Sequence, residues 1–240
     1  MLVKTESIVI RNIRYNDSSI IVQMYTRELG RQSFFVTLSK NRKSAIKAAF
    51  FQPMFILNIE ADVKQGRELQ RIREVHIDTP YSDIPFNIKK NTTTLFLSEM
   101  LGKSLQEESQ DIDLFDFIKT GMTYFDVLEK NIADFHLAFL IKLTRYLGFG
   151  PVRTSSPQEY LDFIEGKFSD HAPVHGFSAL NHSAGYFNNC MTLPYNKLND
   201  LQLTNQQRAT ILEDILTYYK IHLPGFTGLH SLDILREVFK

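Results

Sequence analysis

Tryptophan is absent from this 240-residue chain, cysteine occurs once, and glycine and proline number only 11 and 8. The single cysteine, Cys190, excludes a disulfide within the chain and fits a reducing compartment. The low glycine and proline content, together with 19 phenylalanines, is not that of a disordered segment. The composition therefore predicts a folded globular protein with a substantial apolar core.

Long apolar segments are absent as well. The longest uninterrupted apolar run, residues 137–141, is far too short to cross a bilayer. The residues after Met1 contain no apolar core of the length that a signal peptide needs. We therefore expect a cytoplasmic protein that does not contact membranes.

The net charge is zero, but the charge is unevenly distributed. Residues 1–80 carry 13 Lys and Arg against 8 Asp and Glu, a net charge of +5, so the remainder carries −5. A basic first third on an acidic remainder indicates that any contact with a polyanion belongs to the N-terminal part.

The basic charge is most concentrated in residues 39–47, directly after the apolar run 34–38. Four cations without a nearby acid stand in these nine residues: Lys40, Arg42, Lys43 and Lys47. Such a cluster repels itself, and a surface that meets an anion relieves that repulsion. A short basic loop at the end of a sheet suits a nucleic-acid backbone. The alternative is a solvated surface loop that binds nothing.

The N-terminal part has the period of two that β-strands show. We expect strands at 5–13, 19–25, 31–38, 54–59 and 69–77, with a short helix near 45–51. Gly30 supplies the positive φ that a tight connection between the second and third strands requires. Five short strands with a helix after the third suit a small closed barrel such as the OB fold. An SH3-like barrel has the same periodicity and stays open as an alternative.

Aromatic residues interleave with the basic residues of this part of the chain. They could stack on bases, but most are expected to fill the barrel. Alternation along the strand forces one of Phe34 and Phe35 inward. We therefore expect no more than one or two of the six to contact nucleic acid: Tyr15, Tyr25, Phe34, Phe35, Phe50 and Phe51.

Beyond Pro80 and Pro85 the period becomes helical, which places a domain boundary between residues 1–80 and 81–240. The pattern predicts a helix at 88–105, with Leu95, Phe96, Met100 and Leu101 facing inward. It predicts a second helix capped by Asp111 or Asp113 and a buried central helix at 133–147. A capping box at Thr204 and Gln207 predicts the start of a further helix, and a last helix is expected at 231–239. The predicted fold class is α+β, a five-stranded barrel followed by an all-α domain.

Residues 151–203 are less regular, and we expect a short helix at 158–165 and a loop or short hairpin at 171–190. Three histidines and the cysteine gather there, but only His171 and His175 have zinc-ligand spacing, so an ordinary polar loop is favoured. The acids at 107–113 indicate a solvated linker. Motifs for a phosphate loop, a nucleophile elbow or a zinc hydrolase are absent from the sequence, so an enzyme such as a nuclease or deaminase is disfavoured.

Several segments, in order along almost the whole chain, resemble the bacterial recombination mediator RecO family. They are the opening residues 5–11 with Tyr15-Asn16-Asp17-Ser18, the turn Tyr25-Thr26-Arg27-Glu28-Leu29-Gly30, the basic loop at 39–44 followed by Gln52-Pro53, the helix end Leu147-Gly148-Phe149-Gly150-Pro151, and the C-terminal Leu223-Pro224-Gly225 with Ser231-Leu232-Asp233-Ile234-Leu235.

The resemblance implies an OB fold, a helical domain and a non-enzymatic role in DNA repair and recombination, in the RecFOR pathway at the nucleoid. It implies binding of single- and double-stranded DNA, strand annealing and loading of recombinase onto DNA coated by single-strand-binding protein. The implied partners are RecR and the C-terminal tail of single-strand-binding protein. The family's basic loop corresponds to Lys40, Arg42 and Lys43; from charge alone we add Lys47, Arg14, Arg27 and Arg31.

The chain departs from the family pattern at one place. Many members hold zinc with four cysteines after the Gly-Phe-x-Pro segment, whereas here Arg153-Thr154-Ser155-Ser156 occupies the first pair's place. A four-cysteine site is impossible, so we expect no metal or other cofactor. Packing should hold the segment 151–195 instead, through Tyr160, Phe163, Phe168, Phe177, Tyr186 and Phe187.

A second hypothesis treats the protein as an interaction scaffold with incidental DNA contact. Its apolar helices would offer a groove to the acidic tail of single-strand-binding protein. The cations expected at the rim of that groove are Lys142, Arg145 and Lys220.

Overall fold

The computed structural model describes residues 1–38, 46–105, 109–155, 158–198 and 200–239. The chain forms two compact units. The first comprises residues 1–127 with 231–235, and the second comprises residues 128–230 with 236–240. We describe each unit by itself.

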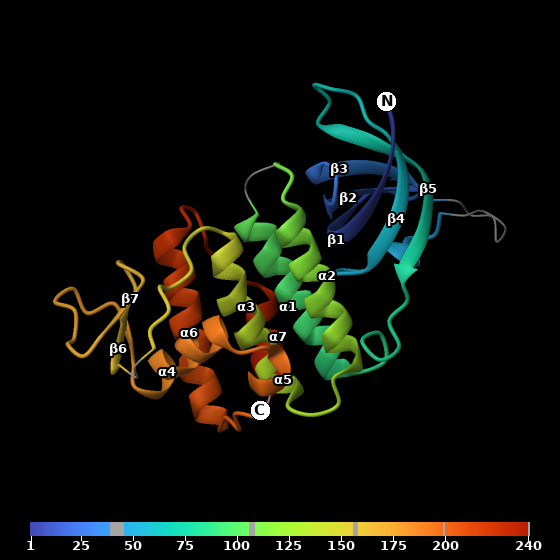
Figure 1. Ribbon diagram of the computed structural model, residues 1–240. Coiled ribbons are helices and arrows are strands. Elements are labelled where there is room, and N and C mark those ends of the chain that lie inside the picture. Colours follow the sequence, from blue (N-terminus) through green and yellow to red (C-terminus); the bar gives the residue numbers. More distant parts are fainter. Residues whose placement is uncertain (39–45, 106–108, 156–157, 199, 240) are drawn as a thin grey trace. The chain divides into compact units, whose positions relative to one another are not determined.

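The first unit contains a closed barrel with the strand order β1-β2-β3-β5-β4 (Figure 1). A 3-10 helix, η1 (Ala48–Phe51), lies between β3 and β4. The barrel and helix are those of an OB-type fold, and the predicted fold class is confirmed. The strands are β1 (Leu2–Asn16), β2 (Ser19–Thr26), β3 (Gly30–Thr37), β4 (Ile56–Asp62) and β5 (Leu69–Thr79).

Alternation along the strands fills the barrel. Phe34 points inward and is fully buried, whereas Phe35 is only partly buried, as the period of two requires. Gly30 has a φ of +67° at the β2–β3 turn, which confirms the expected tight connection. The buried core of the barrel consists of Val9, Ile20, Val22, Met24, Phe34, Val36, Phe51, Leu57, Ile59, Ala61 and Val75.

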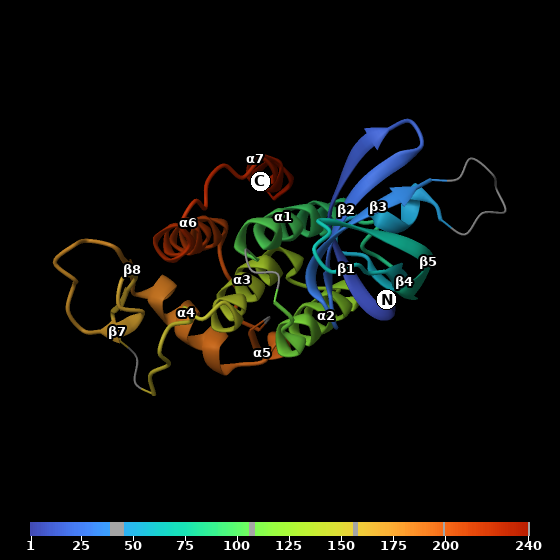
Figure 2. The same cartoon turned by 90° about the horizontal axis from the view of Figure 1, so that it is seen from above.

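Two helices of the first unit lie next to the barrel, as Figures 1 and 2 show. They are α1 (Ile88–Ser104) and α2 (Ile112–Val127). Asp111 caps α2 by accepting a hydrogen bond from the backbone N–H of Leu114 at 2.9 Å. The prediction that Leu95 faces inward is wrong: its side chain is 40% exposed, and Leu97 is buried instead.

The second unit is built around α3 (Phe135–Tyr146), most of which is buried, as the apolar sequence predicted. The capping box at Thr204 and Gln207 opens α6 as expected. The other elements are η2 (Ile132–Asp134), β6 (Tyr160–Asp162), β7 (Lys167–Ser169), β8 (Ser178–Leu180), α4 (His182–Thr192), α5 (Tyr195–Leu198) and α6 (Asn205–His222); α7 (Ser231–Val238) follows, with its first five residues assigned to the first unit.

Residues 158–190 differ from their predicted structure. A three-stranded sheet with the order β7-β6-β8 replaces the expected short helix, and α4 replaces the expected loop or hairpin. Contacts distant in sequence explain both corrections, since Phe163 and Phe187 pack on the ring of Tyr218 in α6. Phe177 does not join this packing; its side chain is 50% exposed and stacks on His175.

None of the helices in the described parts of the chain combines the length and the apolar character that a bilayer crossing requires.

Candidate nucleic-acid interface

The outer surface of the barrel is covered by helices on one part and open on another. On the covered part, Tyr25 stacks on Phe115 of α2, with ring centroids 6.5 Å apart, and Ile10 lies beneath α1 beside Gly102. Burial, followed by the nearby Asp111 carboxylate, raises the pKa of Tyr25 to about 12. The hydroxyl of Ser98 donates a hydrogen bond to the carbonyl of Ile10. Helices α1 and α2 thus occupy this part of the sheet.

The open part follows from strand register. Ile13 pairs with Ile21, Ile21 with Phe35, and Phe35 with Arg71, which forms one row across four strands. A neighbouring row runs from Arg11 through Gln23 and Ser33 to Leu69. These side chains point away from the core, because their strand neighbours fill it. We call this surface the open face: Arg11, Ile13, Tyr15, Ile21, Gln23, Ser33, Phe35, Leu69 and Arg71.

The open face carries positive charge without a carboxylate among its own side chains. Arg11 and Arg71 are exposed, and within the described parts of the chain neither forms an ion pair. The nearest ion pair along β1 joins Arg14 to Asp17 at 2.8 Å, and both of its side chains are exposed. An exposed pair of this kind contributes little to stability.

The centre of the predicted basic loop, with Lys40, Arg42 and Lys43, lies outside the described residues. The chain leaves the barrel beside the β1–β2 turn, since the backbone N–H of Leu38 donates to the carbonyl of Ser18 at 2.7 Å. It is described again from Ile46, and Lys47 is exposed at the start of η1.

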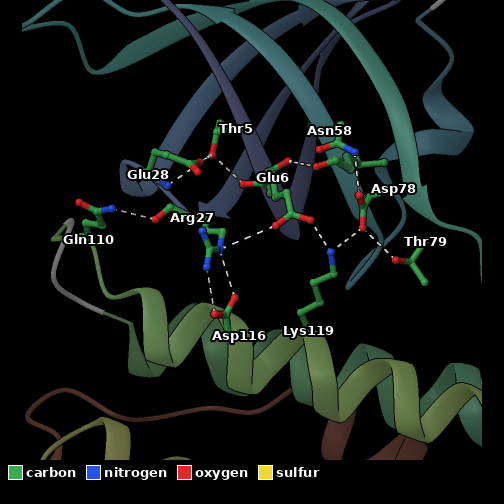
Figure 3. A network of polar contacts seen from close by, with 12 residues as sticks. Thr5, Glu6, Arg27, Glu28, Asn58, Asp78, Thr79, Gln110, Asp116 and Lys119 are labelled. Atoms are coloured by element: carbon green, nitrogen blue, oxygen red, sulfur yellow. Dashed lines mark hydrogen bonds and ion pairs between the residues drawn. The ribbon is translucent and has the colours of Figure 1, made fainter.

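Arg27 and Arg31, also predicted to bind DNA, are not among the open-face residues, although Arg31 contacts Gln23 of that face. The guanidinium of Arg27 donates to both carboxylate oxygens of Asp116 in α2, at 3.1 and 3.2 Å, and lies 3.8 Å from Glu6 (Figure 3). The hydrogen bond to Asp116 raises the pKa of Arg27 and lowers that of Asp116. Arg31 donates to the carbonyl of Leu105 and, at 3.5 Å, to Gln23. Both arginines hold the first unit together through contacts within it.

A second cation, Lys119 of α2, completes this polar network. Its ammonium contacts Glu6 and lies 2.7 Å from Asp78, whose carboxylate also accepts hydrogen bonds from Asn58 and Thr79 (Figure 3). Burial raises the pKa of Asp78, but these hydrogen bonds outweigh burial and place the pKa below its ordinary value. Sequence reasoning missed this network, because its members are up to 113 residues apart.

The cations predicted for a peptide groove lie in the second unit, where two are exposed and one is not. Arg145 and Lys220 are exposed, whereas the ammonium of Lys142 donates to the carbonyls of Cys190 and Leu193, both at 2.6 Å. Burial lowers the pKa of Lys142, and the charge of Arg145 lowers it further. Lys142 therefore caps the C-terminal end of α4.

The described residues contain no group of three or more His, Cys, Asp or Glu side chains placed to hold a metal ion. His175 lies 3.1 Å from the carboxylate of Asp162, and Cys190 is buried in α4. Burial raises the pKa of the Cys190 thiol to about 12.

Comparison with known proteins places this geometry in one family. The family described as "Recombination protein O N terminal" matches residues 1–81, and "Recombination protein O C terminal" matches residues 85–233. Proteins named DNA repair protein RecO from Phocaeicola vulgatus and Flavobacterium psychrophilum are 35% and 37% identical over the full length of both chains. The RecO protein of Porphyromonas gingivalis is 30% identical, again over both full lengths. This chain belongs to the RecO family of DNA repair proteins.

Proposed function

We propose that this protein is a non-enzymatic recombination mediator that binds single- and double-stranded DNA with its barrel and anneals complementary strands. In this proposal, residues 1–80 are the DNA-binding domain, and the helical part, residues 81–240, contacts partner proteins. The open face is the observation that carries the proposal: Arg11 and Arg71 are exposed there, and among the described residues no carboxylate forms an ion pair with either. Membership of a family named for DNA repair supports the assignment.

Charge neutralisation is the proposed mechanism. Arginine and lysine side chains that contact phosphates release the counterions condensed on the strand, so affinity falls steeply as salt is added. Two strands bound to one basic surface repel each other less, which speeds their pairing. The predicted loop cations Lys40, Arg42, Lys43 and Lys47 extend the surface beyond the end of β3. Arg14, which shares β1 with the open face, adds to it once its weak pair with Asp17 opens.

The wider role follows from the same surface. A mediator that anneals strands in the nucleoid must act on DNA coated by single-strand-binding protein, and we propose that it helps load recombinase there. RecR and the tail of single-strand-binding protein are the proposed partners. With Lys142 committed to the end of α4, Arg145 and Lys220 remain as the cations proposed for the tail.

The test is annealing of complementary labelled oligonucleotides, with and without single-strand-binding protein, at several salt concentrations. The wild type should accelerate annealing. The double variant Arg42→Ala with Lys43→Ala should weaken DNA binding, and the slope of log affinity against log salt concentration should decrease by the contribution of about two phosphate contacts. Lys4→Ala with Arg73→Ala is the matched control, because both cations already pair with Glu60 and Asp62.

Two results would contradict the proposal. A wild type that ignores oligonucleotides at low salt removes DNA binding altogether. Normal tail-peptide binding by a protein that does not anneal would favour the scaffold hypothesis instead.

A further inference from the structure

The apolar strip of the open face has a geometry that phosphate binding does not explain. Tyr15 is 64% exposed and Ile13 is 40% exposed, although the barrel core is complete without them. The rings of Tyr15 and Phe35 stand nearly perpendicular, with centroids 5.7 Å apart and an interplanar angle of 79°. An edge contact of this kind is a favourable arrangement for two aromatic rings, and it fixes the Tyr15 ring in place while leaving much of it in solvent.

The backbone contributes to this placement. The β1–β2 pairing shifts register between Arg14 and Asn16, so Tyr15 sits at an irregularity of β1 beside the hairpin turn. Such irregularities re-aim a side chain relative to the regular pleat. Tyr15 is thereby held over Phe35 of β3, which lies two strands away.

Cations stand at both ends of the strip. On β1, Arg11 stands two residues before Ile13 and begins the neighbouring row, and on β5 Arg71 ends the row that contains Ile13 and Phe35. Three strand spacings separate β1 from β5, which amounts to about 14 Å across the sheet. A strand laid obliquely across the two rows would meet Arg11, then the aromatic and apolar strip, and then Arg71. That order matches phosphate, base and phosphate in an unpaired strand.

We propose that Tyr15, supported by Phe35, is a stacking platform that makes the open face select an unpaired strand over a duplex. This inference rests on the proposed DNA-binding function and names the form of DNA that this face prefers. A duplex buries its base faces in its own stack, so Tyr15 has no face to contact there, while Arg11 and Arg71 meet phosphates of either form. In annealing, the unpaired substrates bind the platform and the paired product does not, which favours release of the product.

The absence of tryptophan from the sequence allows a direct test. In Tyr15→Trp, the indole is the single tryptophan of the full-length protein, and stacking on a base should quench its fluorescence. Titration with oligothymidylate should produce strong quenching, and titration with a hairpin duplex should produce little. Phe86→Trp is the matched control, because Phe86 is an exposed aromatic of the same unit, at 84%, outside the open face. Its fluorescence should stay constant with both ligands.

Binding measurements by fluorescence anisotropy complete the test. Tyr15→Ala should weaken oligothymidylate binding about tenfold, within the range of one stacked base, and leave duplex binding and the salt slope unchanged. Tyr15→Phe should restore the affinity, because it keeps the ring. Equal losses for single strand and duplex, or no quenching in a Tyr15→Trp protein that binds the oligonucleotide, would overturn the platform and leave DNA binding standing. A wild type that binds neither ligand would overturn both proposals.

Discussion

Two outer surfaces of the same barrel use charged residues in opposite ways. On the side of β4 and β5, which we call the ion-paired face, Lys4 pairs with Glu60 at 3.1 Å and Arg73 with Asp62 at 2.7 Å. On the open face, Arg11 and Arg71 have no such partner within the described part of the chain. Charge on the ion-paired face is neutralised locally, and charge on the open face is available to a ligand.

The difference shows that the number of cations does not define a nucleic-acid site. Arg71 and Arg73 stand two residues apart on β5, and Asp62 of β4 is the register partner of Arg71, yet among the described residues it is Arg73 that forms the ion pair with Asp62. The pairing of β4 with β5 shifts register between Glu60 and Ala61, and the Asp62 carboxylate contacts Arg73 at 2.7 Å, while Phe35 of β3 is the register partner on the other side of Arg71. The side-chain ion pair, rather than strand register, therefore decides which arginine remains available to a phosphate.

Charge reversal on the open face should give the largest change in DNA affinity, and the same reversal on the ion-paired face is its control. Arg11→Glu with Arg71→Glu should weaken binding of a single-stranded oligonucleotide at low salt by about 100-fold, because two phosphate contacts become repulsive. That loss corresponds to about 2.7 kcal/mol. Lys4→Glu with Arg73→Glu changes the net charge equally and should have a much smaller effect. Anisotropy titrations compare the wild type and the two double variants; equal losses on the two faces would mean that net charge, rather than position, governs binding.

A substitution in the polar network of Asp78 and Lys119 should lower the stability of the fold and leave DNA binding unchanged, and this change in free energy should be smaller than the loss of binding above. Asp78→Asn should lower the free energy of unfolding by about 1 kcal/mol at pH 7, since it removes one of the two carboxylate partners of Lys119. DNA affinity should not change. Urea unfolding and anisotropy measure the two quantities on the same protein.

The pH dependence of this variant follows from the lowered pKa of Asp78. A carboxyl whose folded pKa lies below its ordinary value of 3.8 stabilises the fold above that value, and the contribution disappears as the pH falls through the folded pKa. The stability gap between wild type and Asp78→Asn should therefore shrink when unfolding is measured at pH 3. A gap of the same size at pH 7 and pH 3 would show that the Asp78 charge does not act as described.

Much of the barrel could be predicted because its signals are local. The alternation that sends Phe34 inward and Phe35 outward, and the positive φ of Gly30, each depend on a few adjacent residues. The capping box at Thr204 is local as well. These features were read correctly from the sequence for that reason.

The remaining features depend on contacts between distant segments. Arg27 is predicted to bind DNA from its charge alone, but its guanidinium donates to Asp116, 89 residues away. α4 contains Gly185, Asn188 and Asn189, which are weak helix formers, and its packing on α6 outweighs them.

Arg11 and Arg71 were missed because charge density along the sequence favours the loop. Tracing the register of β1 against β2, β3 and β5 would have found them.

The central claim is that DNA lies on the open face of the barrel. Photocrosslinking of a single-stranded oligonucleotide containing 5-iodouracil, followed by mass spectrometry of the peptides, tests it most directly. We expect crosslinks in peptides that contain Tyr15 or Phe35, and loss of the Tyr15 crosslink in Tyr15→Ala. Crosslinks confined to peptides of the ion-paired face, around Glu60 and Arg73, would contradict the account.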